Sequence, residues 1–183
     1  MSRRKHARVG IAAIAVLVAA AIAVPALAAT PPARVTQKIV GGSKFVPNRS
    51  VSETVHFKLD RIRIQKGGTV TLVDTTKQDH TFSLVKKRQV PRTGRQVENC
   101  FGPGPCDEIA VAHGAVNPQT GEQQEPTKLR VNVGKAGFNQ PGDSVVVPAG
   151  KRVKVKVTSG QALYYICAIH PWMLGAINAP APR

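Results

Sequence analysis

Residues 164–175 have the sequence YYICAIHPWMLG. This stretch contains Cys167, His170 and Met173, so a histidine lies three positions from a sulfur-bearing residue on either side. On a loop that joins two strands, side chains at this spacing can all turn toward one point. Thiolate, imidazole and thioether groups are metal ligands, and the loop therefore predicts a metal site. A second nitrogen ligand would have to come from another part of the chain.

The segment Asp79-His80-Thr81-Phe82 offers that nitrogen at the start of a predicted strand. Two histidines and a cysteine with a weak axial methionine form the ligand set of a blue-copper electron-transfer site. We therefore expect one copper ion with four ligands, which are His80, Cys167, His170 and Met173. A Cys/His site also binds zinc, but the sulfur-rich set favours copper.

The chain has three cysteines, an odd number for an exported protein. Cys100 and Cys106 enclose the turn-rich sequence FGPGP, which brings their Cα atoms close enough for a disulfide. That pairing leaves Cys167 as the free thiol. On its own, Cys167 could equally be a small buried hydrophobic residue.

Short apolar or alternating runs separated by Gly, Pro and Asp predict strands on both sides of a long intervening segment. No long amphipathic helix is evident, so the fold class is all-β, a sandwich or barrel. Residues 86–143 form a predicted insertion stapled by the disulfide, with one short helix beginning at Asp107 and Glu108. The expected strands are Val55–Ile64, Thr69–Val73, Thr81–Val85, Leu129–Val133, Ser144–Val147, Lys151–Thr158 and Ala162–Ile166.

The loop pattern C-x-x-H-P-[aromatic]-M-x-G, together with the upstream D-H-x-F, resembles the cupredoxins, the superfamily of plastocyanin and azurin. The short ligand loop is similar to that of amicyanin. The resemblance implies a Greek-key β-sandwich with a type 1 copper ion. It also implies that the ring edge of His170 reaches the surface through an apolar patch, which Ala168, Pro171 and Trp172 would help to build.

Three features depart from the cupredoxin pattern. The insertion makes the separation between His80 and Cys167 unusually long. Thr81 occupies a position where many members have asparagine, and Ile169 precedes the second histidine where members often have proline. The last two differences concern the hydrogen bonds around the ligands, which tune a metal site, and leave the ligands unchanged.

Arg3, Arg4, Lys5 and Arg8 precede an apolar run from Val9 to Ala29. This pattern predicts an export signal peptide over residues 1–28, although an uncleaved membrane anchor is the alternative. We expect a linker or first strand over residues 29–50, the cupredoxin domain over residues 51–178 and a disordered tail over residues 179–183. Export would place the domain in the periplasm, on the cell surface or outside the cell.

The chain carries 26 Lys and Arg against 10 Asp and Glu, a net charge of +16. Nucleic acid is a disfavoured partner because cations such as Lys154 and Lys156 alternate with valines, as on a solvated sheet face, and no nucleic-acid-binding motif accompanies them. A basic surface instead favours a redox partner protein with an acidic docking surface. We expect a monomer that meets the membrane only through an uncleaved N-terminal segment.

No nucleophile–base pair, phosphate-binding glycine loop or paired carboxylates indicate an enzyme. His56 is interpreted as a sheet-face residue and His113 as part of the insertion, since two spare histidines cannot build a second copper cluster. The predicted function is single-electron transport. The alternatives are a protein that sequesters or delivers copper in the cell envelope, and a secreted structural or adhesion β-domain.

Overall fold

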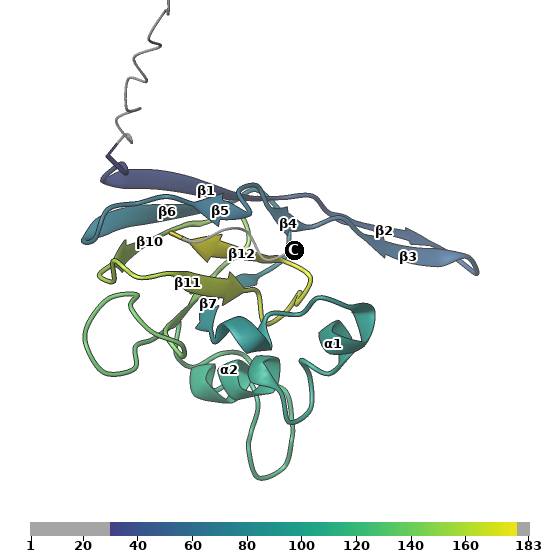
Figure 1. The fold of residues 1–183 in the computed structure, drawn as a ribbon. Helices are drawn as coiled ribbons and strands as arrows, with labels where there is room; N and C mark the ends of the chain where they lie inside the picture. Colours follow the sequence, from purple (N-terminus) through teal and green to yellow (C-terminus); the bar gives the residue numbers. More distant parts are fainter. Residues whose placement is uncertain (1–29, 179–183) are drawn as a thin grey trace, which may run out of the picture.

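The structure is a computed structural model that describes residues 30–178. The expected signal peptide and the expected C-terminal tail lie outside this range. Two β-sheets pack face to face around one hydrophobic core, and a third, two-stranded sheet projects from one end (Figure 1). The prediction of an all-β sandwich with a disulfide-stapled insertion is therefore confirmed.

The first sheet joins the beginning of the described chain to its second half. β1 pairs in parallel with β6, with Arg34 opposite Thr69. β1 lies within residues 29–50, for which a linker or first strand was expected, and it is an inner strand of this sheet. The strands, in spatial order, are β10 (Arg152–Val157), β6 (Gly68–Asp74), β1 (Arg34–Val40) and β4 (His56–Phe57).

The second sheet places the two parts of the predicted metal site side by side. β7 and β11 are antiparallel neighbours, with Ser83 opposite Ile166. The start of β7, at His80, therefore lies next to the end of β11, just before Cys167. The strands, in spatial order, are β5 (Arg61–Ile62), β12 (Leu174–Ile177), β11 (Leu163–Ile166), β7 (His80–Val85), β9 (Ser144–Val147) and β8 (Arg130–Val131).

One expected strand is divided. Residues 55–64 were predicted to form a single strand, but the chain crosses between the sheets there, with β4 in the first sheet and β5 in the second. An aromatic cluster fills the core below this crossing. The ring centroids of Phe82 and Tyr165 are 4.4 Å apart, and Phe57 meets both rings edge-on. The Tyr165 hydroxyl donates to the Leu59 carbonyl at 2.7 Å, so its buried polar end has a partner.

The insertion covers the outer face of β7. It contains η1 (Lys87–Gln89), α1 (Gly94–Glu98) and α2 (Pro105–His113). The predicted helix is α2, with Pro105 in its first turn and Gly114 ending it at φ 69°. A second apolar cluster links the insertion to the sheet, and all six residues of β7 are consequently buried. None of the helices within residues 30–178 is long and apolar enough to cross a membrane.

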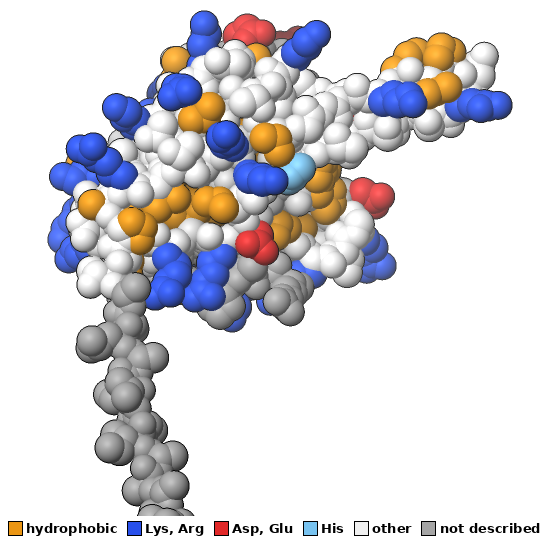
Figure 2. Space-filling view, turned by 90° about the horizontal axis from the view of Figure 1, so that it is seen from above, with side chains coloured by type: hydrophobic (Ala, Val, Ile, Leu, Met, Phe, Trp, Pro, Cys, Tyr) orange, Lys and Arg blue, Asp and Glu red, His pale blue; other side chains and the backbone are white. Residues whose placement is uncertain are grey.

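A β-hairpin arm was not predicted. β2 (Ser43–Val46) pairs only with β3 (Ser50–Glu53) and extends away from the sandwich (Figures 1 and 2). Phe45 and Val51 lie opposite each other on this hairpin and are 71% and 69% exposed. At its base the Gln78 side chain donates to the Ser43 hydroxyl, which joins the arm to the loop before His80.

Candidate metal centre

His80, Cys167 and His170 converge in the interior at one end of the sandwich. His80 is the first residue of β7, and the other two lie on the loop between β11 and β12. Their candidate ligand atoms all lie within 4.8 Å of one another. The Cys167 sulfur is 3.9 Å from Nδ1 of His80 and 3.8 Å from Nδ1 of His170, and the two Nδ1 atoms are 3.1 Å apart.

These distances fit the donor atoms of a single small metal ion. Ligand nitrogens at about 2.0 Å and sulfur at about 2.3 Å from one ion, with angles of about 100° to 120°, are roughly 3.1 to 3.8 Å apart. The three measured separations lie within this range or 0.1 Å beyond it. The structure thus brings together three of the four predicted ligands in an arrangement that suits a metal.

The environment favours neutral imidazoles. Burial lowers the pKa of His80, although the nearby carboxylates of Asp74 and Asp79 act in the opposite direction. Burial, followed by the proximity of His80, lowers the pKa of His170 to about 4. The Thr76 hydroxyl donates to the Gln78 carbonyl and can therefore accept the Nε2–H of His80 at 2.9 Å. This contact leaves the Nδ1 lone pair of His80 directed at the site, a common arrangement for a metal-bound histidine.

Burial raises the pKa of the Cys167 thiol, although the Thr81 N–H beside the sulfur opposes this effect. The N–H of Thr81 donates to the sulfur at 3.3 Å. The Thr81 hydroxyl also accepts the N–H of Ala168 at 2.7 Å. Thr81 thus holds the sulfur and the residue after it. A bound metal ion would replace the thiol proton, because the thiolate is the metal-binding form.

Met173 closes the ligand loop through its main chain. Its N–H donates to the His170 carbonyl at 2.8 Å, and its carbonyl accepts the Cys167 N–H at 2.9 Å. The side chain is buried and belongs to the same apolar cluster as Cys167. These bonds tie the first, middle and last candidate ligands of the loop into one compact turn, which fixes their relative positions.

The apolar surface beside His170 differs from the one expected. Ala168 and Pro171 are buried, whereas Ile169 and Trp172 are more than 40% exposed. The Trp172 ring meets the His170 ring edge-on at 5.2 Å, and its indole N–H donates to the Val55 carbonyl at 3.2 Å. The exposed apolar side chains of this loop are therefore Ile169 and Trp172, whereas His170 itself is 7% exposed.

The other two histidines within residues 30–178 are not part of the group that His80, Cys167 and His170 form. His56 is exposed on β4, and its Nδ1 contacts the Thr54 carbonyl at 2.8 Å. His113 is buried at the end of α2, where it contacts the Ser144 hydroxyl. Sequence reasoning did not identify Ser83 and Ser144, which lie between His113 and Thr81. The available signal was the presence of hydroxyl residues at alternate positions of β7.

No family model and no curated protein matches this chain. Several solved structures are similar to it, and they include cupredoxins. A purple cupredoxin from Nitrosopumilus maritimus is 13% identical, with 78% of this chain and 95% of that one covered and a TM-score of 0.39. Auracyanin from Roseiflexus castenholzii is 13% identical, with 82% and 99% covered and a TM-score of 0.41. A copper-containing nitrite reductase from Thermus scotoductus is 16% identical, with 90% and 25% covered and a TM-score of 0.37.

Proposed function

We propose that this protein is a cupredoxin that carries single electrons between redox partners with one type 1 copper ion. His80, Cys167 and His170 would be the strong ligands in this proposal, and Met173 would be a weaker fourth ligand. Copper supplies the chemistry when bound, by alternating between Cu(I) and Cu(II). The observation that carries the proposal is that one sulfur and two Nδ1 atoms lie 3.1 to 3.9 Å from one another, as ligand atoms around one small ion would.

The protein residues hold the site in one geometry. The Thr81 N–H and the Ala168–Thr81 hydrogen bond fix the Cys167 sulfur from the side of β7. The Met173 main chain fixes the loop from the other side. A site fixed before electron transfer needs little rearrangement when the charge changes, which favours fast one-electron exchange.

Electron transport fits the burial of the ligands better than copper delivery does. Delivery requires the receiving protein to contact the ligand atoms as the metal moves across. Cys167 is fully buried, and Met173 is 1% exposed. An electron can cross a short protein barrier, whereas a metal ion cannot leave without exposing these groups. Sequestration or delivery of copper remains the alternative, and rapid copper loss to a chelator would support delivery.

We expect docking at the surface formed by Ile169 and Trp172, because it lies next to His170. The proposed occupant is a redox protein with an acidic rim around an apolar patch. Without the four cations of the predicted signal peptide, the chain has 22 Lys and Arg against 10 Asp and Glu, and this net charge of +12 supports the choice. Figure 2 likewise shows many Lys and Arg side chains and few acidic ones on the face that it presents.

The protein is proposed to act after export, in the periplasm, on the cell surface or outside the cell. The basic and apolar N-terminal sequence is typical of a signal peptide. The Cys100–Cys106 disulfide also fits an oxidising compartment.

Titration of the metal-free protein with Cu(II), followed in the visible range, tests the function. The proposal predicts an intense blue band at one equivalent that ascorbate bleaches. Cys167→Ser should abolish the band, while His56→Ala, which alters an exposed histidine away from the site, should retain it. Absence of an intense band in the wild-type protein would contradict the proposal.

A further inference from the structure

A chain of buried polar groups connects the insertion to the candidate metal centre. It begins at His113, whose Nε2 is 2.7 Å from the Ser144 hydroxyl. The Ser144 and Ser83 hydroxyls are 2.6 Å apart, and the Ser83 and Thr81 hydroxyls are 2.9 Å apart. The chain ends at Thr81, whose hydroxyl accepts the Ala168 N–H and whose main-chain N–H donates to the Cys167 sulfur. Every link lies within hydrogen-bond distance.

The strand geometry explains why these groups meet. Ser83 and Ser144 are directly opposite each other on β7 and β9. Thr81 and Ser83 are two residues apart on β7 and so point to the same face. That face is turned toward the insertion, whereas the Phe82 and Leu84 side chains belong to the main core. Hydroxyl groups in such a buried layer are stable only with partners, and His113 is the partner that α2 provides.

The contacts of the two ring nitrogens of His113 define its role. Its Nδ1 contacts the Lys128 carbonyl, which can only accept a hydrogen bond. Nδ1 therefore carries hydrogen, and Nε2 faces the Ser144 hydroxyl at 2.7 Å. Burial lowers the pKa of His113, which supports the neutral ring, although the Lys128 contact opposes this effect. The ring is thus fixed at both nitrogens between the insertion and the sheet.

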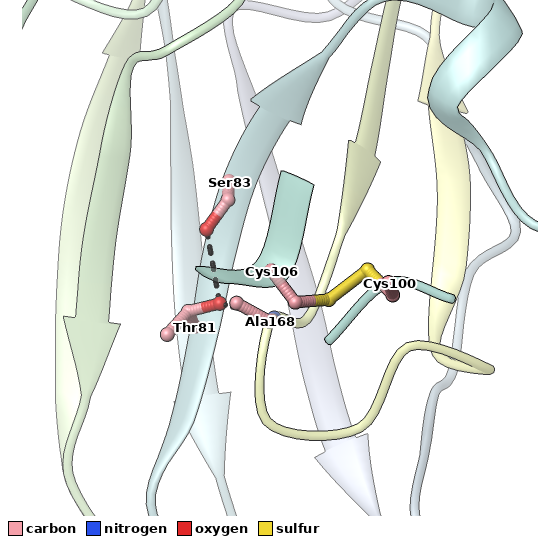
Figure 3. Close-up of a disulfide and its surroundings, with 5 residues drawn as sticks. All are labelled: Thr81, Ser83, Cys100, Cys106 and Ala168. Atoms are coloured by element: carbon pink, nitrogen blue, oxygen red, sulfur yellow. Dashed lines mark hydrogen bonds between the residues drawn. A yellow bond between two sulfur atoms is a disulfide. The ribbon is translucent and has the colours of Figure 1, made fainter. Parts of the chain in front are cut away.

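The N-terminal end of α2 packs beside the ligand loop. Cys106 lies in the first turn of α2 and is bonded to Cys100. The disulfide shares an apolar cluster with Ile166 and Ala168, the two neighbours of Cys167 in sequence. Figure 3 shows the disulfide beside Ala168, with Thr81 and Ser83 on the adjoining strand. Helix α2 therefore contacts the surroundings of Cys167 through both of its ends.

We propose that His113 is a positioning residue for the metal centre, which acts through Ser144, Ser83 and Thr81 to hold Cys167 and Ala168 in place. The expected effect of His113 on electron transfer rests on the proposed function. The expected effect of His113 on the position of Cys167 does not, because it applies to the metal-free protein as well. It also gives the insertion a function, which is to support the ligand loop from outside the sheet.

The test compares three variants. His113→Phe removes both ring nitrogens and fills the site, and His113→Gln restores a donor and an acceptor. Ile109→Ala is the matched control, since this residue is a buried part of α2 that packs in the same cluster as the disulfide. Should His113→Phe not fold, Ser144→Ala breaks the same chain with a smaller change in volume.

Two measurements on the metal-free protein decide the structural part. They are hydrogen exchange at the amides of Thr81 and Ala168, and the rate at which a soluble aromatic disulfide modifies Cys167. We expect His113→Phe to accelerate both by roughly tenfold, with partial recovery in His113→Gln and a smaller change in Ile109→Ala. Unchanged rates in folded His113→Phe, or equal changes in Ile109→Ala, would overturn the proposal.

The copper-loaded protein gives the second readout. Weaker hydrogen bonding to the Cys167 sulfur should lower the reduction potential in His113→Phe and shift the blue band, with recovery in His113→Gln. An unchanged potential and band would overturn the link to the metal centre. If the wild-type protein does not bind copper, the proposed function fails, yet the two metal-free measurements still decide whether His113 positions Cys167.

Discussion

The main-chain N–H of Thr81 donates a hydrogen bond to the sulfur of Cys167, although 86 residues separate them in sequence. The same residue accepts the Ala168 N–H through its hydroxyl. Thr81 therefore holds the ligand loop with two groups of different kinds. A substitution can remove the hydroxyl without altering the main-chain donor, which separates the two contributions.

We expect Thr81→Val to lower the free energy of unfolding by about 1–3 kcal/mol, because it leaves the buried Ala168 N–H without an acceptor. The copper site should still form, since the N–H to the sulfur remains. Urea denaturation of the metal-free protein measures the loss, and Thr81→Ser is the control that keeps the hydroxyl. An equal loss in Thr81→Ser would contradict this explanation.

Gly175 provides a steric prediction. A Cβ at this position would lie 2.3 Å from the Tyr165 hydroxyl oxygen and 2.9 Å from the Asp60 carbonyl oxygen. Gly175→Ala should therefore destabilise the fold by about 1–3 kcal/mol, the usual cost of overpacking a core. Gly160→Ala is the matched control, because its Cβ would meet only the Lys66 Cβ at 3.9 Å. Similar thermal unfolding of the two variants would refute the steric argument.

His113 predicts a loss of stability in acid. Its pKa in the folded protein lies below the ordinary value of 6.5, mainly because of burial. As the pH falls below 6.5, the unfolded chain takes up a proton at this position that the folded protein resists, so the free energy of unfolding decreases. His113→Gln should therefore make the difference in stability between pH 7.5 and pH 5 smaller. Urea denaturation of the metal-free protein at both pH values measures this, with His56→Gln as the control for loss of a histidine. If the difference in stability between the two pH values is as large in His113→Gln as in the wild-type protein, the prediction is wrong.

The cysteines predict a simple count. Cys100 and Cys106 form a disulfide, while Cys167 is free and buried. Thiol titration of the metal-free protein, denatured without reductant, should find one thiol per chain, and reduction should raise the number to three. Modification of the unreduced protein followed by peptide mapping should locate the label at Cys167. A label at Cys100 or Cys106 would show a different pairing.

Replacing the disulfide tests how the insertion is anchored. The double variant Cys100→Ser and Cys106→Ser should lose about 2 kcal/mol of stability, as expected for a cross-link that closes a short loop. Because the disulfide also packs beside Ala168, thiol modification of Cys167 should become faster. The rate is compared with that of the wild-type protein under non-reducing conditions. An unchanged rate would mean that the bond stabilises the insertion alone.

The ligand loop could be interpreted from the sequence because its information is local. Cys167 and His170 are three residues apart, and a compact turn brings them together. His80 required a further step, since only the pairing of β7 with β11 brings it to the loop. The typical D-H-x-F pattern indicated that pairing. The Cys100–Cys106 disulfide was likewise predictable because the intervening glycines and prolines favour a tight turn.

The support around the site was not predictable in the same way. Ser144 begins an apolar strand, and nothing nearby in sequence indicates that it faces Ser83 or His113. The exposed face expected for a sandwich strand is covered here by α2, so the buried hydroxyls of β7 are explained only by the tertiary structure. The arm of β2 and β3 was not predicted for a related reason: residues 29–50 were expected to be a linker or first strand, and the two strands of the arm pair only with each other.

X-ray absorption at the copper edge of the loaded wild-type protein tests the central claim most directly, because it counts and identifies the atoms that contact the metal. The account predicts two nitrogen ligands and one short sulfur ligand, with the sulfur contribution lost in Cys167→Ser and one nitrogen lost in His80→Ala. A copper shell without sulfur, or one that His80→Ala leaves unchanged, would contradict it.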